Sequence, residues 1–186
     1  MKYIIFGLGN IGQEYAATRH NIGFMVADAL AKQEGASFDI DKHAFVTEIK
    51  YKGRSILLVK PTTYMNASGK AVNYWLTTQK VPVENSLVLV DELALPFGTL
   101  RMRGQGSHAG HNGLKDIEAV LGNNNYPRLR FGIGNDYPKG RQVDYVLGEF
   151  TKDEQIELPQ LIEKASAMVL SFCTAGLSMT MNQYNK

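Results

Sequence analysis

Several loops of the sequence carry polar side chains that could together activate water. Neutral imidazole takes a proton from water near pH 7, and a carboxylate on its second nitrogen fixes the tautomer and stabilises the imidazolium that forms. His20 and Asp91 suit these two roles. Carboxamides can orient water or donate to a developing oxyanion, and three lie in such loops: Asn10, Asn66 and Asn112. The joint pattern predicts a pocket for general-base hydrolysis.

Each of these residues also has a purely structural explanation. Asn66 and Asn112 stand where helices are predicted to begin, and asparagine is a common N-cap. Asp91 could be a buried, hydrogen-bonded acid at a strand end, and Met65 could fill core space. Taken singly, capping is the better explanation for the asparagines. Only the joint pattern favours catalysis.

Covalent and metal-dependent hydrolysis fit the sequence less well. Ser68 and Ser107 lie near the candidate residues, but neither is in a G-x-S-x-G motif, and Cys173 lies in a mostly apolar helical stretch. The four histidines show no H-E-x-x-H spacing, and one cysteine cannot make a thiolate site. We interpret His43 and His108 as surface or capping residues. Direct attack by water is predicted, with no metal and no cofactor.

The glycines at 7–12 match G-x-G-x-x-G directly after a predicted strand, which raises a dinucleotide-binding oxidoreductase as an alternative. In that fold a helix begins within the motif and points its N-terminus at the pyrophosphate, whereas here QEYAATRH intervenes before the helical pattern starts. The acid about 20 residues further on, Asp28, falls inside that helix. The context therefore argues against dinucleotide binding.

The elements that must position these side chains follow from hydrophobic patterning. Strands are predicted at 2–6, 44–50, 54–60, 86–92, 99–103 and 128–134, the second and third forming an antiparallel hairpin. Helices are predicted from Asn21, as an N-cap, to near Gly35, over 66–79, and over 111–122 with Gly122 as terminator. His20 then lies at a helix entrance, and Asp91 at the carboxyl end of a buried strand.

A polar loop and then a long helix are predicted toward the end of the chain. Loop 135–145 is polar and is expected to be mobile. Thr151 to Glu154 has the spacing of a capping box, and Pro159 could restart the chain in the first turn of a longer helix. That helix would bury one apolar stripe, formed by Leu161, Ile162, Ala165, Met168, Val169 and Phe172.

Interleaved strands and helices predict an α/β fold, a single domain over residues 1–186. We expect a three-layer sandwich with a central twisted sheet, mixed but mostly parallel, flanked by helices. The chain has 44% hydrophobic and 20% charged residues and lacks the roughly 18 consecutive apolar residues that a membrane span requires. We expect a soluble protein. A single cysteine fits a reducing cytoplasm but also many periplasmic proteins.

Net charge is only +2, with a pI near 8.6, so any contact with nucleic acid must be local. Basic residues concentrate in the second half of the chain, which suggests one basic face: Arg101, Arg103, Lys115, Arg128, Arg130, Lys139 and Arg141.

Ordered blocks across nearly the whole chain resemble bacterial peptidyl-tRNA hydrolases. These blocks are GLGN near the start, Y-x3-RHN at 15–21, KPTTYMNASG at 60–69, VDEL-x-LPFG at 90–98, GSHAGHNGLKDI at 106–117 and RLRFGIG at 128–134. The resemblance implies an enzyme that cleaves the ester between a peptide and the terminal ribose of tRNA, and thereby recycles tRNA from aborted translation.

The resemblance also implies roles for individual residues. His20 matches the catalytic histidine and Asp91 the acid that orients it, while Asn10, Asn66 and Asn112 match asparagines that hold the peptide end and the reaction centre. Further matches are pocket positions, Tyr15, Met65 and His111, and basic positions that contact tRNA, Arg103 and Arg130, with Lys139 and Arg141 in a variable loop. A cytoplasmic monomer that binds the acceptor stem and terminal CCA of peptidyl-tRNA is expected.

Two positions depart from the family pattern. Ile11 replaces a proline usual after the early asparagine, and Ala109 replaces a glycine usual in the loop before His111. Neither change removes a reacting group, but a methyl at Ala109 limits backbone freedom in a loop that the family uses as a gate. An RNA-binding module without hydrolysis is the leading non-enzyme alternative, which the intact set of His20, Asp91 and asparagines disfavours.

Overall fold

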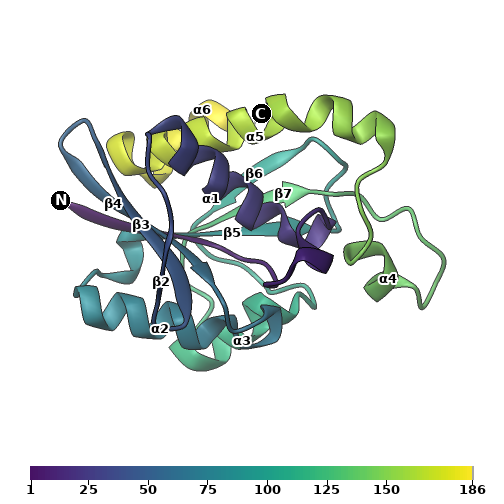
Figure 1. Cartoon of the computed structure of the whole chain (residues 1–186), viewed down its shortest axis with the longest axis horizontal. Helices are drawn as coiled ribbons and strands as arrows, with labels where there is room; N and C mark the ends of the chain where they lie inside the picture. The colour runs from purple at the N-terminus through teal and green to yellow at the C-terminus, as the bar shows by residue number, and fades with distance from the viewer. Residues whose placement is uncertain (186) are drawn as a thin grey trace.

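The computed structural model describes residues 1–185, and these form one seven-stranded sheet between two layers of helices (Figure 1). The strand order is β2-β3-β4-β1-β5-β7-β6. The strands are β1 Lys2–Gly7, β2 Asp39–Asp41, β3 Ala44–Tyr51, β4 Arg54–Pro61, β5 Ser86–Glu92, β6 Leu100–Arg103 and β7 Arg128–Gly132. The α-helices are α1 Ile22–Gln33, α2 Ser68–Gln79, α3 Asn112–Leu121, α4 Gln142–Val146, α5 Lys152–Ala175 and α6 Leu177–Tyr184.

The sheet is parallel at its centre and antiparallel toward both edges. β1 pairs in parallel with β4 and β5, and β5 pairs in parallel with β7. The β3–β4 hairpin, strand β2 and the edge strand β6 pair antiparallel to their neighbours. This mixed sandwich confirms the predicted fold class, and it brings the carboxyl ends of four parallel strands to one edge of the sheet.

Alternate residues of the central strands fill two separate cores. Ile5 packs in a core with residues of α1 and α5, whereas Ile4 and Phe6 pack with residues of α2 and α3. In Figure 1, α1, α5 and α6 lie above the sheet, and α2 and α3 lie below it. Because side chains of a strand alternate between faces, a buried strand must be apolar at every position. The fully buried β5 is apolar from Leu87 to Val90, as predicted from its sequence.

Local end signals are confirmed at several helices. Gly122 closes α3 in the left-handed conformation, and Thr151 and Glu154 form the predicted capping box at the start of α5. The predicted side-chain cap at Asn21 is wrong: α1 begins at Ile22, but the Asn21 side chain makes no cap hydrogen bond. It bonds the backbone of Asn10 instead, because the loop after β1 passes within reach.

Four further features differ from the sequence prediction. The end of the polar loop 135–145 forms helix α4, and strand β2 and helix α6 were not predicted. α5 runs from Lys152 through Pro159 without a restart. Proline removes one helical hydrogen bond, and the carbonyl left without a donor belongs to exposed Gln155, to which water can donate instead. Within residues 1–185, no helix has the length and apolar composition needed to cross a bilayer.

Candidate active site

The carboxyl edge of the sheet gathers the loops that carry the predicted site residues. Asn10 follows β1, and Asp91 is the penultimate residue of β5, the parallel neighbour of β1. His20 sits in a short 3-10 helix, Arg19–Asn21, that leads into α1. Asn66 lies in another, Met65–Ala67, that leads into α2. Strand order rather than distance along the chain therefore brings these side chains together.

His20 and Asp91 form a direct hydrogen bond. Nδ1 of His20 lies 2.8 Å from Oδ2 of Asp91, and the two side chains are 12% and 2% exposed. A carboxylate can only accept this bond, so Nδ1 carries the proton and Nε2 is left as the basic nitrogen. The predicted pair thus meets in the geometry that a general base requires.

Burial and charge act in opposite directions on both pKa values. Burial disfavours the imidazolium form of His20, but the charge and hydrogen bond of Asp91 outweigh this effect and raise the pKa of His20 above its ordinary value of 6.5. Burial likewise disfavours the carboxylate of Asp91, but His20 and His111 outweigh it, so the pKa of Asp91 is held well below its usual range. Asp91 is therefore an anion at neutral pH.

The second oxygen of Asp91 binds another imidazole. Nε2 of His111 lies 2.8 Å from Oδ1 of Asp91. Nδ1 of His111 accepts hydrogen bonds from the backbone N–H groups of Gly113, at 3.1 Å, and Leu114, at 3.3 Å, which makes His111 the N-cap of α3. These bonds fix the neutral tautomer with the proton on Nε2. His111, predicted only as a pocket position, thus braces the carboxylate.

Asn112 and Asn66 do not cap their helices. His111 takes that position at α3, and no side-chain cap bond is present at the start of α2. Both asparagines are exposed, and neither amide makes a side-chain hydrogen bond within the described part of the chain. The structural explanation of these two residues therefore fails, and both amides face a cavity with hydrogen-bonding capacity to offer.

Donor atoms of His20, Asp91 and His111 lie within 4.8 Å of one another, a cluster that could suggest a metal centre. Its hydrogen bonds argue against one. Because Nδ1 of His111 already accepts two backbone N–H groups, Nε2 must hold its proton, and a protonated nitrogen cannot ligate a cation. The cluster fits a hydrogen-bonded relay better than a metal site.

Asn10 is held in one orientation by its surroundings. Its Oδ1 accepts the backbone N–H of Met65 at 2.7 Å, which leaves the Nδ2 donor for a ligand. The side chain of Asn21 clamps the backbone of Asn10, accepting its N–H at 2.8 Å and donating to its carbonyl at 2.9 Å. Sequence reasoning missed Asn21 as a site residue, because its place before a helix suggested an N-cap.

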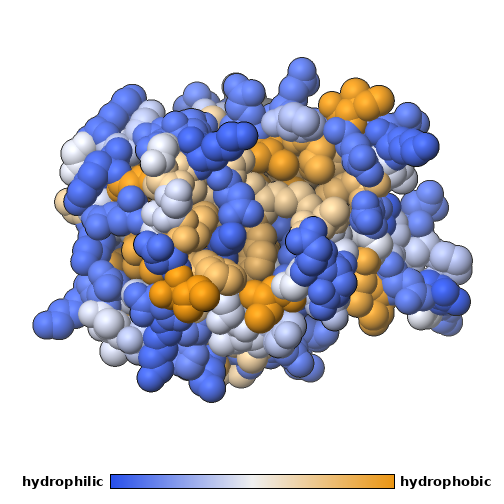
Figure 2. All heavy atoms as spheres, in the orientation of Figure 1, coloured by the Kyte–Doolittle hydropathy of each residue, from blue (hydrophilic) through white to orange (hydrophobic). Residues whose placement is uncertain are grey.

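Two neighbouring cavities share His20 in their lining. The larger, about 300 Å³, is lined by most of the predicted site residues, namely Asn10, Tyr15, His20, Met65, Asn66 and Asn112. Tyr64, which was not predicted, also lines it, together with Val143, Val146 and Leu147 of the α4 segment. The smaller, about 70 Å³, reaches Asp91, Glu92 and His111. His20, Asn112, Val143 and Val146 line both. Figure 2 shows apolar atoms at the surface over α4, beside this region.

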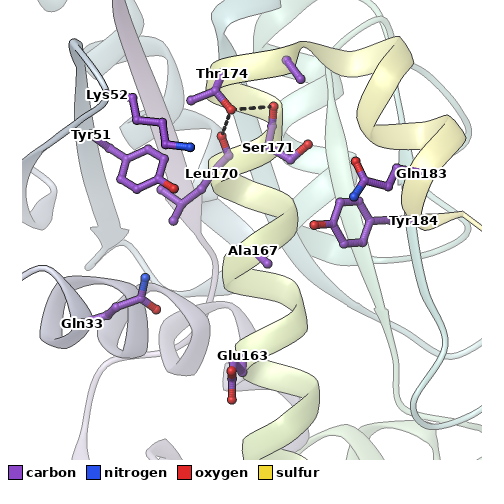
Figure 3. A pocket seen from close by; sticks show the side chains of 11 residues that line it. Gln33, Tyr51, Lys52, Glu163, Ala167, Leu170, Ser171, Thr174, Gln183 and Tyr184 are labelled. Carbon is purple, nitrogen blue, oxygen red and sulfur yellow. Dashed lines mark hydrogen bonds between the residues drawn. The ribbon is translucent and has the colours of Figure 1, made fainter.

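A cavity larger than the one at His20 lies at the opposite end of the molecule. It has a volume of about 490 Å³ and lies between Gln33, the β3–β4 turn, α5 and α6 (Figure 3). Its hydroxyl donor Thr174 is bonded to carbonyl oxygens of its own helix, those of Leu170 and Ser171. It contains no histidine next to an acid, so size alone does not identify the candidate active site.

The structure gives no support for Cys173, Ser68 or Ser107 as a nucleophile. Cys173 is buried, and burial raises the pKa of its thiol to about 12, so it holds its proton at neutral pH. Ser68 is buried and donates to the carbonyl of Met65. Ser107 accepts the backbone N–H of Ala109.

Ala109, which replaces the glycine of the family pattern, has φ +50°, a left-handed conformation in which glycine is less strained than alanine.

The predicted basic residues fall into two groups. Arg103, Lys139 and Arg141 are exposed. Arg130 has a side chain only 14% exposed, pairs with Glu92 and donates to the carbonyl of Ser107 at 2.8 Å. Arg128, counted in the basic cluster from the sequence, is wholly buried and donates to backbone carbonyls, so it cannot contribute to a basic face. The three exposed cations remain predictions for tRNA contact.

Fold and site together define a three-layer α/β protein with a carboxylate-bound histidine at the carboxyl edge of its sheet, which is an arrangement suited to general-base chemistry. A sequence model of the family described as "Peptidyl-tRNA hydrolase" matches residues 4–186. The chain belongs to this family.

Individual relatives agree over the full length. Peptidyl-tRNA hydrolase of Bacteroides fragilis is 56% identical over 186 residues, covering all of both chains. That of Cytophaga hutchinsonii is 57% identical over 185 residues, covering 100% of this chain and 98% of the relative. The crystal structure of peptidyl-tRNA hydrolase from Acinetobacter baumannii superimposes with a TM-score of 0.92 at 36% identity, covering 98% of this chain and 94% of that one.

Proposed function

We propose that His20 activates water for hydrolysis of the ester that joins a peptide to the terminal ribose of tRNA. As a member of the peptidyl-tRNA hydrolase family, the chain is an enzyme that hydrolyses peptidyl-tRNA. The observation that carries the proposed mechanism is the 2.8 Å hydrogen bond between Nδ1 of His20 and Oδ2 of Asp91. It leaves Nε2 as a base beside a cavity large enough for part of a substrate.

The proposed reaction needs no covalent intermediate. Nε2 of His20 takes one proton from water as the water oxygen attacks the ester carbon. Asp91 stabilises the resulting imidazolium. Nδ2 of Asn10, left available by the Met65 contact, donates to the oxyanion. When the carbon–oxygen bond breaks, the imidazolium returns the proton to the ribose oxygen, which releases tRNA and the peptide acid.

The remaining pocket residues are proposed to hold the peptide end. Asn66 and Asn112 present amides that can pair with peptide groups, and Tyr15 and Met65 line the same cavity. His111 is proposed to act through Asp91, because its Nε2 donates to that carboxylate. Val143, Val146 and Leu147 of the α4 segment form an apolar wall of this cavity. This wall would exclude water from the peptide side of the ester.

The tRNA part of the substrate is proposed to contact the basic residues that the family resemblance indicates. Exposed Arg103, Lys139 and Arg141, with partly buried Arg130, are proposed to bind phosphates of the acceptor stem beside the terminal CCA. We propose that the protein acts as a monomer in the cytoplasm. Because a single chain supplies all residues of the proposed relay, no second copy is needed for the chemistry.

The test is release of an N-blocked amino acid from tRNA by His20→Ala. We expect turnover to fall at least about 100-fold, while tRNA affinity stays nearly unchanged, because the base is lost and the phosphate contacts are not. His43→Ala is the matched control, since His43 lies outside both cavities, and it should retain activity. Near-normal turnover in His20→Ala would remove His20 from the mechanism.

A further inference from the structure

A buried arginine lies directly before the proposed base. Arg19 is 7% exposed, although arginine side chains are rarely buried without good partners. Its Nε has no hydrogen-bond partner among the described residues, so its burial carries a desolvation penalty that an apolar side chain would avoid. An apolar side chain would fill this space at a lower cost. The arginine is therefore explained better by the contacts that its guanidinium makes.

The guanidinium of Arg19 is attached to the α4 segment and to the start of α5. Nη1 donates to the carbonyl oxygen of Tyr145 at 2.9 Å, and Cζ lies 3.9 Å from the centroid of the Tyr145 ring. Nη2 lies 3.6 Å from Oε1 of Glu154. The backbone N–H of Arg19 also donates to the carbonyl of Gly148 at 2.9 Å. Stacking and hydrogen bonding therefore converge on one short segment, 145–148.

Helix α4 depends on such contacts, because five residues are too few for a stable isolated helix. Val146 is its one buried residue, and the hydroxyl of Tyr145 donates to the carbonyl of Ile133 at 2.6 Å. This weakly supported helix nevertheless supplies Val143 and Val146 to both cavities at His20. Its position decides the shape of the pocket.

We propose that Arg19 is a positioning residue that holds α4 in place as a wall of the substrate pocket. Arg19 and His20 are neighbours in the same 3-10 helix, so one dipeptide carries both the clamp for the wall and the proposed base. The proposal rests on the proposed function of the His20 site. It assigns Arg19 to substrate binding and not to proton transfer, because the His20–Asp91 bond does not involve it.

The test separates binding from chemistry by steady-state kinetics on peptidyl-tRNA. Arg19→Met keeps much of the side-chain volume but loses stacking and donors, and we expect KM to rise about tenfold or more while kcat changes by less than about threefold. The pH of the acid limb of kcat should not move, because the His20–Asp91 pair is intact. Arg19→Lys should recover little, since lysine lacks the planar fork.

Arg54→Met is the matched control. Arg54 also donates to backbone carbonyls, those of Lys52 and Thr174, but at the opposite end of the molecule, and its loss should leave KM unchanged. Amide hydrogen exchange provides a second readout: residues 145–148 should exchange faster in Arg19→Met than in wild type. An unchanged KM, or a fall in kcat alone, would overturn the proposal.

Tyr145→Leu tests the same contact from its other side, if Arg19→Met fails to fold. It removes the stacked ring and the bond to Ile133 without touching the chain next to His20, and the same rise in KM is expected. A Tyr145→Leu enzyme with wild-type KM would refute the clamp. Failure of the proposed function would appear separately, as normal kcat in His20→Ala.

Discussion

At the scale of single residues, Asp91 is the centre of the site. Each of its carboxylate oxygens binds one imidazole, His20 on one side and His111 on the other. His111 is itself fixed by the first turn of α3. The carboxylate is therefore held from two directions, which restricts the orientation of the His20 ring more than a single pair would.

The pH dependence of Asp91→Asn follows from the direction of the His20 pKa shift. Neutral His20 is the proposed base, so activity should rise with pH through a His20 pKa that lies above 6.5 in the wild type. Removing the negative charge removes the effect that raises this pKa. We expect the acid limb of kcat/KM to move to lower pH, and the maximal rate to fall at least about tenfold because the tautomer is no longer enforced.

Asp28→Asn is a suitable control for this experiment, because Asp28 is an exposed acid on α1 that pairs with Lys60 away from the cavities. Its profile should match the wild type. An Asp91→Asn profile that keeps its acid limb in place would refute the proposed pairing of His20 with Asp91.

At the scale of elements, the close approach of α1 to the sheet determines where His20 lies. A Cβ atom on Gly23 would lie 2.5 Å from backbone atoms of Leu8 and 2.6 Å from the carbonyl oxygen of Leu89. Only glycine lets the first turn of α1 rest on the ends of β1 and β5. This contact brings the 3-10 helix of His20 over Asp91.

Gly23→Ala tests this packing. The added methyl must push α1 away from the strands, so we expect the free energy of unfolding to fall by about 1–3 kcal/mol. Urea denaturation measures this change, and kcat should fall as well because His20 moves with the helix. Lys32→Ala, an exposed change on the same helix, should be nearly neutral. Unaltered stability in Gly23→Ala would mean that α1 can shift at no cost.

At the scale of the whole molecule, a small net charge of +2 must be compatible with binding a polyanion. Burial removes Arg128 from the surface, and pairing with Glu92 offsets the charge of Arg130. Three basic residues assigned to tRNA contact remain exposed: Arg103, Lys139 and Arg141. Arg103 ends β6 opposite Arg128, at the start of β7, and Arg141 pairs with Asp144. We therefore expect a local footprint with few phosphate contacts.

Salt dependence of tRNA binding measures this footprint. For Arg103→Ala, the slope of log affinity against log salt should become shallower by about 0.7 to 0.9, the value for one lost phosphate contact. Catalysis at saturating substrate should persist, because Arg103 lines neither cavity at His20. Lys164→Ala, an exposed change on α5, is the control and should keep the wild-type slope. An equal slope in both variants would remove Arg103 from the interface.

Much of this fold was predictable because its signals are short-range. The hairpin, the buried strand that ends at Asp91, the Gly122 terminator and the capping box at Thr151 each follow from residue types within one element. The carboxyl-edge rule for parallel strands then predicted that His20, Asp91 and Asn10 would meet. Sequence patterns and the family resemblance together indicate these residues without any knowledge of their geometry.

Tertiary structure alone decided which atoms pair. The local sequence around Asn21 fits a helix cap as well as the observed bonds to Asn10. Likewise, the local sequence around Arg19 fits a surface cation as well as the partner of Tyr145, 126 residues away. Such pairs depend on strand order and on how closely α1 and α4 approach the sheet edge. Hydrophobic periodicity records which face of an element is buried, but it carries no information about which distant side chain will be found there.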